Sequence, residues 1–383
     1  MNRADCGNGC AAGTSNRIIG YAALVVFFSI FIPTICCDGW AADRLPLKHA
    51  GLFSMDCLED GFRKVTDGAG RSLLLAPRGK PIPSAYRNLP TITIPVNRVA
   101  LESAVYAALL RPLDVLESIV GVGVRMDICY MDDLKKKIAK GEVIKLGCDG
   151  PMDYERLKVL SPDVFFAGNW NKKLIHKLDE LNIPVAIIDC FEEAHPLGRL
   201  EWIKFVAAFF DREDDAQQVF NRAAKKIAAV SERCAAANSH PRVVAGGVFD
   251  GKVHVPSAKS VTANMIAIGG GDYIFKDLDL KGYMGGYGNI TLEEFYVRAK
   301  HANVYILETS PAYGISSIET LVTRDDMLAD IKSVRDGNVW CSMPWYWESI
   351  DKTDEIIADL AAIFHPKLFP GHRPRHFFKL PEK

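Results

Sequence analysis

Residues 211–237 predict one long helix in the middle of the chain. Apolar residues recur there at steps of three and four, which places them on one helix face: Ala216, Val219, Phe220, Ala223, Ile227, Val230 and Cys234. Asp211 is the expected N-cap, and the helix ends before Pro241. At about 1.5 Å per residue it spans roughly 39 Å. A helix of this length can join two separate lobes.

On both sides of this helix, short runs of β-branched and aromatic residues alternate with helical stretches. This alternation indicates sheets covered by helices on both faces. The predicted fold class is therefore α/β, with two Rossmann-like lobes joined by one long helix. The predicted parts are an N-terminal segment (1–41), a hairpin at 62–77 with an irregular, proline-rich lead-in (42–95), an N-terminal lobe (96–198), inter-lobe helices (199–240) and a C-terminal lobe (241–383).

The N-terminal segment predicts export. Residues 18–35 are apolar and uncharged and follow Arg17, while Gly39 and Ala41 are small residues at the positions that a signal peptidase recognises. The apolar run is also just long enough for an uncleaved membrane anchor. Lipid attachment at Cys36 or Cys37 is a third interpretation. All three place the remainder of the protein outside the cytoplasm, in the periplasm or tethered to the outer face of the membrane. A buried helix is a further interpretation of the same run, and it would not imply export.

Composition and motifs argue against nucleic-acid binding and catalysis. The formal net charge is −1, and there is no long basic run. Gly121 and Gly123 follow a predicted strand, but Met126 stands where a dinucleotide fingerprint needs its third glycine. The nine histidines are scattered along the chain, whereas a dedicated zinc or manganese site would need several imidazoles. We therefore predict no catalytic residue, metal or cofactor.

Disulfides and buried thiols both remain open for the six later cysteines: Cys57, Cys129, Cys148, Cys190, Cys234 and Cys341.

Aromatic residues gather at the predicted strand ends. Ligands of α/β lobes bind beyond the carboxyl ends of the strands, and aromatic rings suit a large flat or hydrophobic ligand. The candidates after strands are Tyr130, Trp170, Phe191, Tyr313, Trp345, Tyr346 and Trp347. Tyr283 and Tyr287 lie in a glycine-rich loop.

Several ordered stretches resemble one family. Residues 94–122 are IPVNRVALESAVYAALLRPLDVLESIVGV, and residues 146–168 are LGCDGPMDYERLKVLSPDVFFAG. Both are similar to the iron-complex and cobalamin substrate-binding proteins of ABC importers, a family of periplasmic binding proteins with a helical backbone. Further matches follow in the family's order at 65–71, 181–185, 269–274, 290–305, 334–339 and 365–369. The resemblance covers nearly all of residues 60–370.

The resemblance implies a ligand cleft between two lobes whose closure is restricted by one rigid helix. It also implies a glutamate on each lobe that docks on the ABC permease dimer, here Glu155 and Glu293. Glu102 departs from the family's usual small residue, and Met284 and the run 345–347 match no motif of the family. These positions are therefore candidates for determining which ligand binds.

The resulting hypothesis is an exported, non-enzymatic protein that delivers an iron chelate, either a siderophore or haem, to an ABC importer. The nearest alternative is a cobalamin or other corrinoid ligand. A chelatase-like enzyme on the same fold and a sensor that uses the same cleft are alternatives of other classes. If haem binds, candidate iron ligands are Tyr283, Tyr287, His195 and Met284.

Overall fold

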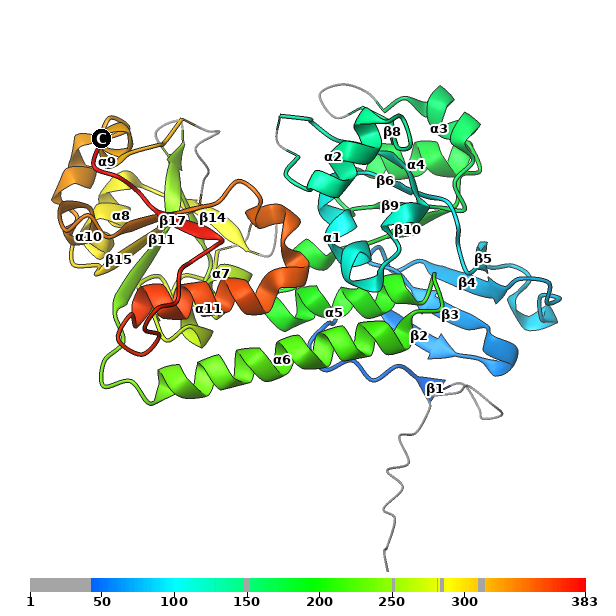
Figure 1. The fold of residues 1–383 in the computed structure, drawn as a ribbon, viewed down its shortest axis with the longest axis horizontal. Coiled ribbons are helices and arrows are strands. Elements are labelled where there is room, and N and C mark those ends of the chain that lie inside the picture. The colour runs from blue at the N-terminus through cyan, green and yellow to red at the C-terminus, as the bar shows by residue number, and fades with distance from the viewer. Residues whose placement is uncertain are drawn as a thin grey trace, which may run out of the picture. The chain divides into compact units, whose positions relative to one another are not determined.

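The structure, a computed structural model, describes residues 43–127, 129–147, 152–249, 252–280, 282, 286–308 and 314–383. Within these ranges the chain forms three sheets with helices packed on them (Figure 1). No helix in the described ranges is both long and apolar enough to cross a membrane. The apolar stretch at 18–35 lies outside them.

The N-terminal lobe is built on a parallel sheet. Its strand order is β10-β9-β6-β7-β8, and every neighbouring pair is parallel. The strands are β6 (Val99–Leu101), β7 (Ile119–Val122), β8 (Ile144–Lys145), β9 (Val164–Ala167) and β10 (Val185–Ile187). The connecting helices are α1 (Ala107–Leu110), α2 (Asp132–Ala139), α3 (Tyr154–Leu160) and α4 (Lys172–Glu180). This arrangement confirms the predicted strand–helix alternation.

A second five-stranded sheet precedes this lobe. Its strands pair in chain order, β1 (Asp43–Arg44), β2 (Ser54–Cys57), β3 (Arg63–Thr66), β4 (Ser72–Pro77) and β5 (Thr91–Ile94). The predicted hairpin is the antiparallel pair β3–β4. The irregular lead-in was expected to continue to residue 95, but β5 lies within it and pairs in parallel with β4. Short strands such as β1 and β5 are specified by partners elsewhere in the chain, so local pattern does not reveal them.

The C-terminal lobe has a mixed sheet. Its order is β14-β12-β11-β15-β16-β17, and β13 pairs with β11. The strands are β11 (Arg242–Phe249), β12 (Lys252–Pro256), β13 (Asp272–Tyr273), β14 (Tyr287–Ile290), β15 (Val304–Leu307), β16 (Val339–Ser342) and β17 (Phe377–Lys379). The helices are α7 (Val261–Ile268), α8 (Leu292–Ala299), α9 (Ile318–Val322), α10 (Lys332–Arg335) and α11 (Thr353–Phe364).

The long helix α6 (Glu213–Ala235) is close to the prediction, but its start differs. Asp211 is not the N-cap: its φ is 55°, and Arg212 holds the cap position without a side-chain cap. Aspartate tolerates this left-handed conformation better than most residues, which allows the chain to turn into α6. Arg63 contacts the carboxylates of Asp211 and Glu213 at 2.9 and 2.5 Å and holds this corner on the N-terminal sheet.

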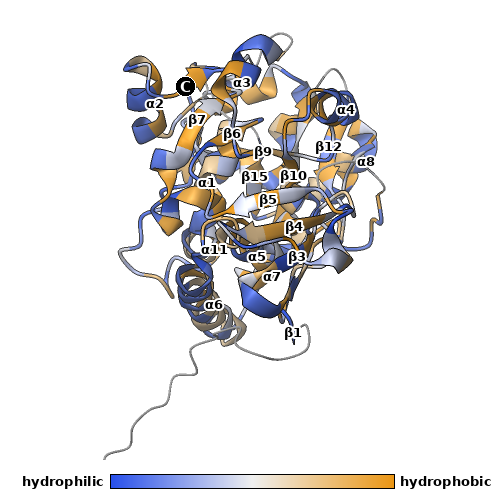
Figure 2. Cartoon of the chain, turned by 90° about the vertical axis from the view of Figure 1, so that its right-hand side faces the viewer, coloured by the Kyte–Doolittle hydropathy of each residue, from blue (hydrophilic) through white to orange (hydrophobic). Residues whose placement is uncertain are grey.

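The inward face of α6 follows the predicted spacing. Ala216, Phe220, Ala223, Ile227 and Cys234 are buried. Figure 2 shows both hydrophilic and hydrophobic residues around α6, as an amphipathic helix requires. This face packs on two helices, α5 (Pro196–Ala207) and α11, and both run beside α6 in Figure 1. Every residue of α5 is buried, so α5 is the central helix and α6 covers it.

Helix α5 carries buried charges that hold an N-terminal strap, defined as residues 45–53. The carboxylate of Glu201 accepts backbone N–H groups of Lys48, His49 and Ala50 at 3.1, 2.8 and 2.9 Å. Lys204 Nζ donates to the same carboxylate at 2.8 Å. Burial by itself raises the pKa of Glu201, but these donors together lower it below the usual range. Hydrogen bonds of this kind offset the cost of burying a charge.

Candidate ligand-binding cleft and docking residues

A row of aromatic rings joins the two lobes. Trp170 follows β9 and Phe191 follows β10, and their ring centroids are 6.4 Å apart. Phe191 in turn lies 6.2 Å from Trp347, which follows β16 in the other lobe. Tyr346 meets Trp347 edge-on at 5.5 Å. The structure therefore brings together four of the predicted ligand-binding residues at the carboxyl ends of strands from both lobes.

Two of these rings are open to solvent. The exposed fractions of Trp170 and Trp347 are 56% and 40%, whereas Phe191 is 5% exposed. Tyr106, buried beneath, stacks on Trp170 at 6.0 Å and supports it from within the N-terminal lobe. Exposed aromatic faces on a buried aromatic base form a surface suited to a flat or apolar ligand.

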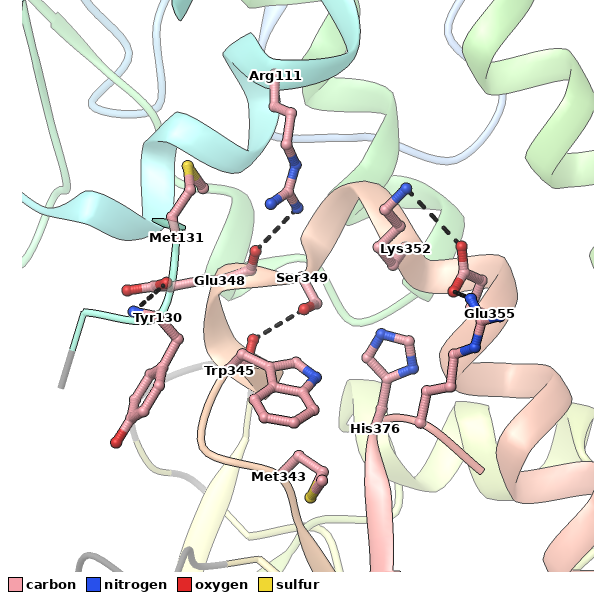
Figure 3. Close-up of a pocket in the computed structure, with 11 residues that line it drawn as sticks. Arg111, Tyr130, Met131, Met343, Trp345, Glu348, Ser349, Lys352, Glu355 and His376 are labelled. Carbon is pink, nitrogen blue, oxygen red and sulfur yellow. Dashed lines mark hydrogen bonds and ion pairs between the residues drawn. The ribbon is translucent and has the colours of Figure 1, made fainter. Parts of the chain in front are cut away.

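Tyr130 and Trp345 do not line this aromatic row but a separate pocket of about 520 Å³ (Figure 3). The pocket is formed by both lobes. Its lining residues are Arg111, Tyr130, Met131, Met343, Trp345, Glu348, Ser349, Lys352, Glu355, Arg375 and His376. The run 345–347 is thus divided between two environments, because consecutive side chains of a tight turn point in different directions.

The lobes are hydrogen-bonded to each other beside this pocket. Arg111, in the N-terminal lobe, donates to both carboxylate oxygens of Asp351 at 2.9 and 2.5 Å. The Tyr130 N–H donates to Glu348 Oε2 at 2.9 Å. Burial raises the pKa of Glu348, and this backbone donor opposes the shift. Glu348 and Asp351 follow Trp347 closely in the sequence. Their hydrogen bonds to the N-terminal lobe therefore also hold the segment that carries the Trp347 ring.

Glu102, a predicted ligand-binding residue, also forms a hydrogen bond within the N-terminal lobe. Its Oε2 accepts the N–H of Gly168 at 2.8 Å and so ties the loop after β6 to the loop that carries Trp170. Burial raises the pKa of Glu102. Gly123 packs closely against the same loop, since a Cβ there would lie 2.1 Å from the carbonyl oxygen of Glu102. This close approach explains Gly123 without any nucleotide.

Three predicted ligand-binding residues, Tyr283, Met284 and Tyr313, lie outside the described residues. Tyr287 is described, and its hydroxyl is engaged within the protein: it donates to Glu308 Oε1 at 2.9 Å. His195, considered as an iron ligand, caps α5, and its Nδ1 accepts the Leu197 N–H at 3.1 Å. Within the described residues, no cluster of three potential metal ligands is present.

Glu308 was missed in the sequence analysis, although it directly follows β15 at the edge where ligands bind. Its Oε1 accepts the hydroxyls of Thr262 and Tyr287 at 2.6 and 2.9 Å. Its Oε2 is buried without a hydrogen-bond partner among the described residues. Burial raises the pKa of Glu308 to about 7, although the two hydroxyls and the positive charge of Arg199 oppose the shift. The sequence signal that could have identified Glu308 is a glutamate directly after a predicted apolar strand.

Replacing Glu308 with glutamine is expected to remove a pH dependence of stability. The raised pKa means that the folded state keeps its proton while the unfolded chain ionises, so stability falls as pH rises from about 4.5 to about 7. The fall is at most about 3.5 kcal/mol, at about 1.4 kcal/mol per pKa unit. Urea unfolding at pH 5, 6 and 7 measures it, and an unchanged slope in Glu308→Gln would contradict this assignment.

The two predicted docking glutamates occupy equivalent local positions. Glu155 lies in the first turn of α3, two residues after the N-cap Asp153. Glu293 lies in the first turn of α8, two residues after the N-cap Thr291. Both glutamates are exposed. A carboxylate in the first turn is favoured by the helix dipole, so this position alone does not imply docking.

The described cysteines form no disulfide. They are Cys57, Cys129, Cys190, Cys234 and Cys341, and all of them except Cys57 are buried. Cys148 lies outside the described residues. The sequence leaves both disulfides and thiols open, and these five cysteines are thiols.

The comparison with known families identifies the class of protein that this fold defines. The family model of periplasmic binding proteins matches residues 99–341, so the chain belongs to that family. Members of this family are solute-binding proteins and not enzymes. The family resemblance and the two-lobed α/β fold predicted from the sequence are both confirmed.

Individual relatives agree with this assignment. An uncharacterized lipoprotein of Methanocaldococcus jannaschii is 30% identical over 333 residues, which cover 83% of this chain and 78% of the relative. A periplasmic solute-binding protein of Veillonella parvula is similar in structure, with a TM-score of 0.57, 18% identity, and 81% and 88% of the two chains covered. The periplasmic haem-binding protein RhuT of Roseiflexus has a TM-score of 0.56, 15% identity, and 71% and 99% covered. Family and relatives fit export or membrane tethering.

Proposed function

We propose that this chain is the substrate-binding protein of an ABC importer and that it delivers an iron chelate, a siderophore or haem. The observation that carries the proposal is the aromatic row Trp170–Phe191–Trp347, which joins both lobes of a periplasmic binding protein. Haem and catecholate chelates present flat or aromatic surfaces, and the partly exposed rings of Trp170 and Trp347 can stack on them. The similarity in fold to a haem-binding protein is compatible with such a ligand.

The two exposed tryptophans of the aromatic row, Trp170 and Trp347, provide the test. Titration with a ferric catecholate siderophore, a ferric hydroxamate siderophore, haem and cobalamin is expected to quench tryptophan fluorescence with at least one iron chelate. Quenching by cobalamin alone would move the assignment to a corrinoid ligand. A protein that responds to none of the four, although it is folded by circular dichroism, would contradict the proposal.

Removal of either exposed ring is expected to weaken binding. Trp170→Ala and Trp347→Ala should each raise the dissociation constant about tenfold, because each loses a stacking partner together with buried apolar area. Calorimetric titration with the chelate identified above measures the change. Trp340→Phe is the matched control, since Trp340 is a half-buried residue of β16 whose indole N–H donates to Asn338. A loss as large in the control would mean that the effect is not specific to the aromatic row.

The partner in transport is proposed to be the ABC permease, contacted by one lobe through Glu155 and by the other through Glu293. Exposed charges of this kind determine encounter and orientation more than affinity. Their equivalent placement on α3 and α8 supports the proposal, because a permease made of two similar halves presents two similar sites.

A further inference from the structure

The outer faces of α3 and α8 share more than a glutamate. Val159 and Val297 stand four residues after Glu155 and Glu293, respectively. Their exposed fractions are 84% and 71%, and no other large apolar side chain in the described part of the chain exceeds 56%. Residues four apart lie next to each other on a helix surface. Each lobe therefore presents a carboxylate and an isopropyl group side by side.

Packing beneath each helix fixes this face outward. Leu157 and Phe295, each two residues after the glutamate, are fully buried. Two residues correspond to about 200° of helix rotation, so burial at that position turns the glutamate and the valine to the opposite side. The same order of N-cap, glutamate, buried apolar residue and exposed valine thus occurs on both helices.

Neighbouring cations do not neutralise these carboxylates. Arg156 pairs with Asp153, and Arg298 pairs with Asp277 and with Glu294. Among the described residues, neither Glu155 nor Glu293 forms a hydrogen bond or an ion pair through its carboxylate. Each lobe consequently offers an unpaired negative charge beside an exposed apolar side chain.

We infer that Val159 and Val297 are apolar anchors of the docking surface proposed above, each placed beside its glutamate on one half of the two-fold permease. Each half of this partner would hold a cationic side chain next to an apolar hollow. Charge complementarity argues for such a protein and against a lipid surface, because anionic headgroups repel carboxylates. Repetition of the pattern on two lobes argues for a partner with two equivalent sites. The inference rests on the proposed transport function, to which it adds the apolar contacts.

The test uses the full-length protein loaded with the chelate identified above, membrane vesicles from the native host, and protein-free liposomes as the blank. Val159→Ser, Val297→Ser and the double variant are compared with Glu155→Arg/Glu293→Arg. Each valine variant is expected to weaken vesicle association about five- to tenfold, since burying a valine side chain changes an equilibrium constant by about that factor. Chelate affinity is expected to remain unchanged. The matched control is Ile82→Ser, at an apolar side chain that is 37% exposed in the segment between β4 and β5.

The outcomes separate this inference from the function on which it rests. Loss in the valine variants that exceeds the loss in the control supports the apolar anchors. If the glutamate variant loses association and the valine variants keep it, the anchors are wrong and the docking function stands. If none of the variants loses association, the docking function itself fails. Equal binding to protein-free liposomes, or a valine effect confined to self-association in analytical ultracentrifugation, would also overturn the inference.

Discussion

Replacing Glu155 and Glu293 together with arginine is expected to abolish uptake of the chelate while leaving its dissociation constant unchanged. Both side chains are exposed on helices at the outside of their lobes, so neither supports the core or the aromatic row. The double change replaces two attractive contacts with two repulsive ones, and like charges across an interface cost several kcal/mol. Uptake of the radiolabelled chelate into host cells that carry the variant, together with calorimetry on the purified protein, measures both quantities.

The matched control for this experiment is Glu232→Arg/Glu319→Arg. These two glutamates are also exposed and helical, on α6 and α9, so the control makes the same change in net charge elsewhere on the surface. It is expected to keep normal uptake. Normal uptake in the Glu155/Glu293 variant, or equal loss in the control, would show that these carboxylates are not the docking residues.

Replacing Glu201 with alanine is expected to destabilise the protein by about 3–5 kcal/mol, the usual cost of breaking a buried ion pair. The change leaves Lys204, whose side chain is 4% exposed, without its carboxylate. It also removes the acceptor of three backbone N–H groups in the N-terminal strap. Urea unfolding followed by circular dichroism measures the change in free energy.

A second variant separates the effect of the unpaired Lys204 charge from the effect of losing the hydrogen bonds to the strap. In Glu201→Gln/Lys204→Met the unpaired ammonium is gone, so much of the lost stability should return.

The lowered pKa of Glu201 also means that its contribution to stability is present above about pH 4.5 and is lost as pH falls through the folded-state value. A loss below 1 kcal/mol in Glu201→Ala at pH 7 would contradict this account of the strap.

Apolar periodicity was sufficient to predict an element where the burial of that element alone determines the spacing of its apolar residues. The inward face of α6 and the buried strands β7, β9 and β15 lie where the sequence predicts them, because apolar spacing reflects burial directly. The strand-end positions of Trp170, Phe191 and Trp347 likewise agree with the row that these rings form, and their role in ligand binding stays a prediction. Local pattern predicted a helix here but not that α5 is buried on every side, because the helix contains Arg199, Glu201 and Lys204. Arg199 and Lys204 find partners nearby in sequence, whereas Glu201 also accepts backbone N–H groups of the strap about 150 positions away.

The sequence by itself determined the class of fold, the family, and the kind of residue at the strand ends, since these depend on apolar spacing and on ordered motifs. Only the tertiary structure decided which of those residues meet. It joined Phe191 to Trp347 across the lobes, assigned Trp345 to a different pocket, and placed Glu308 in a buried network. The reason is that such contacts join residues on different elements of the chain, at least 21 positions apart, and their geometry follows from how those elements pack.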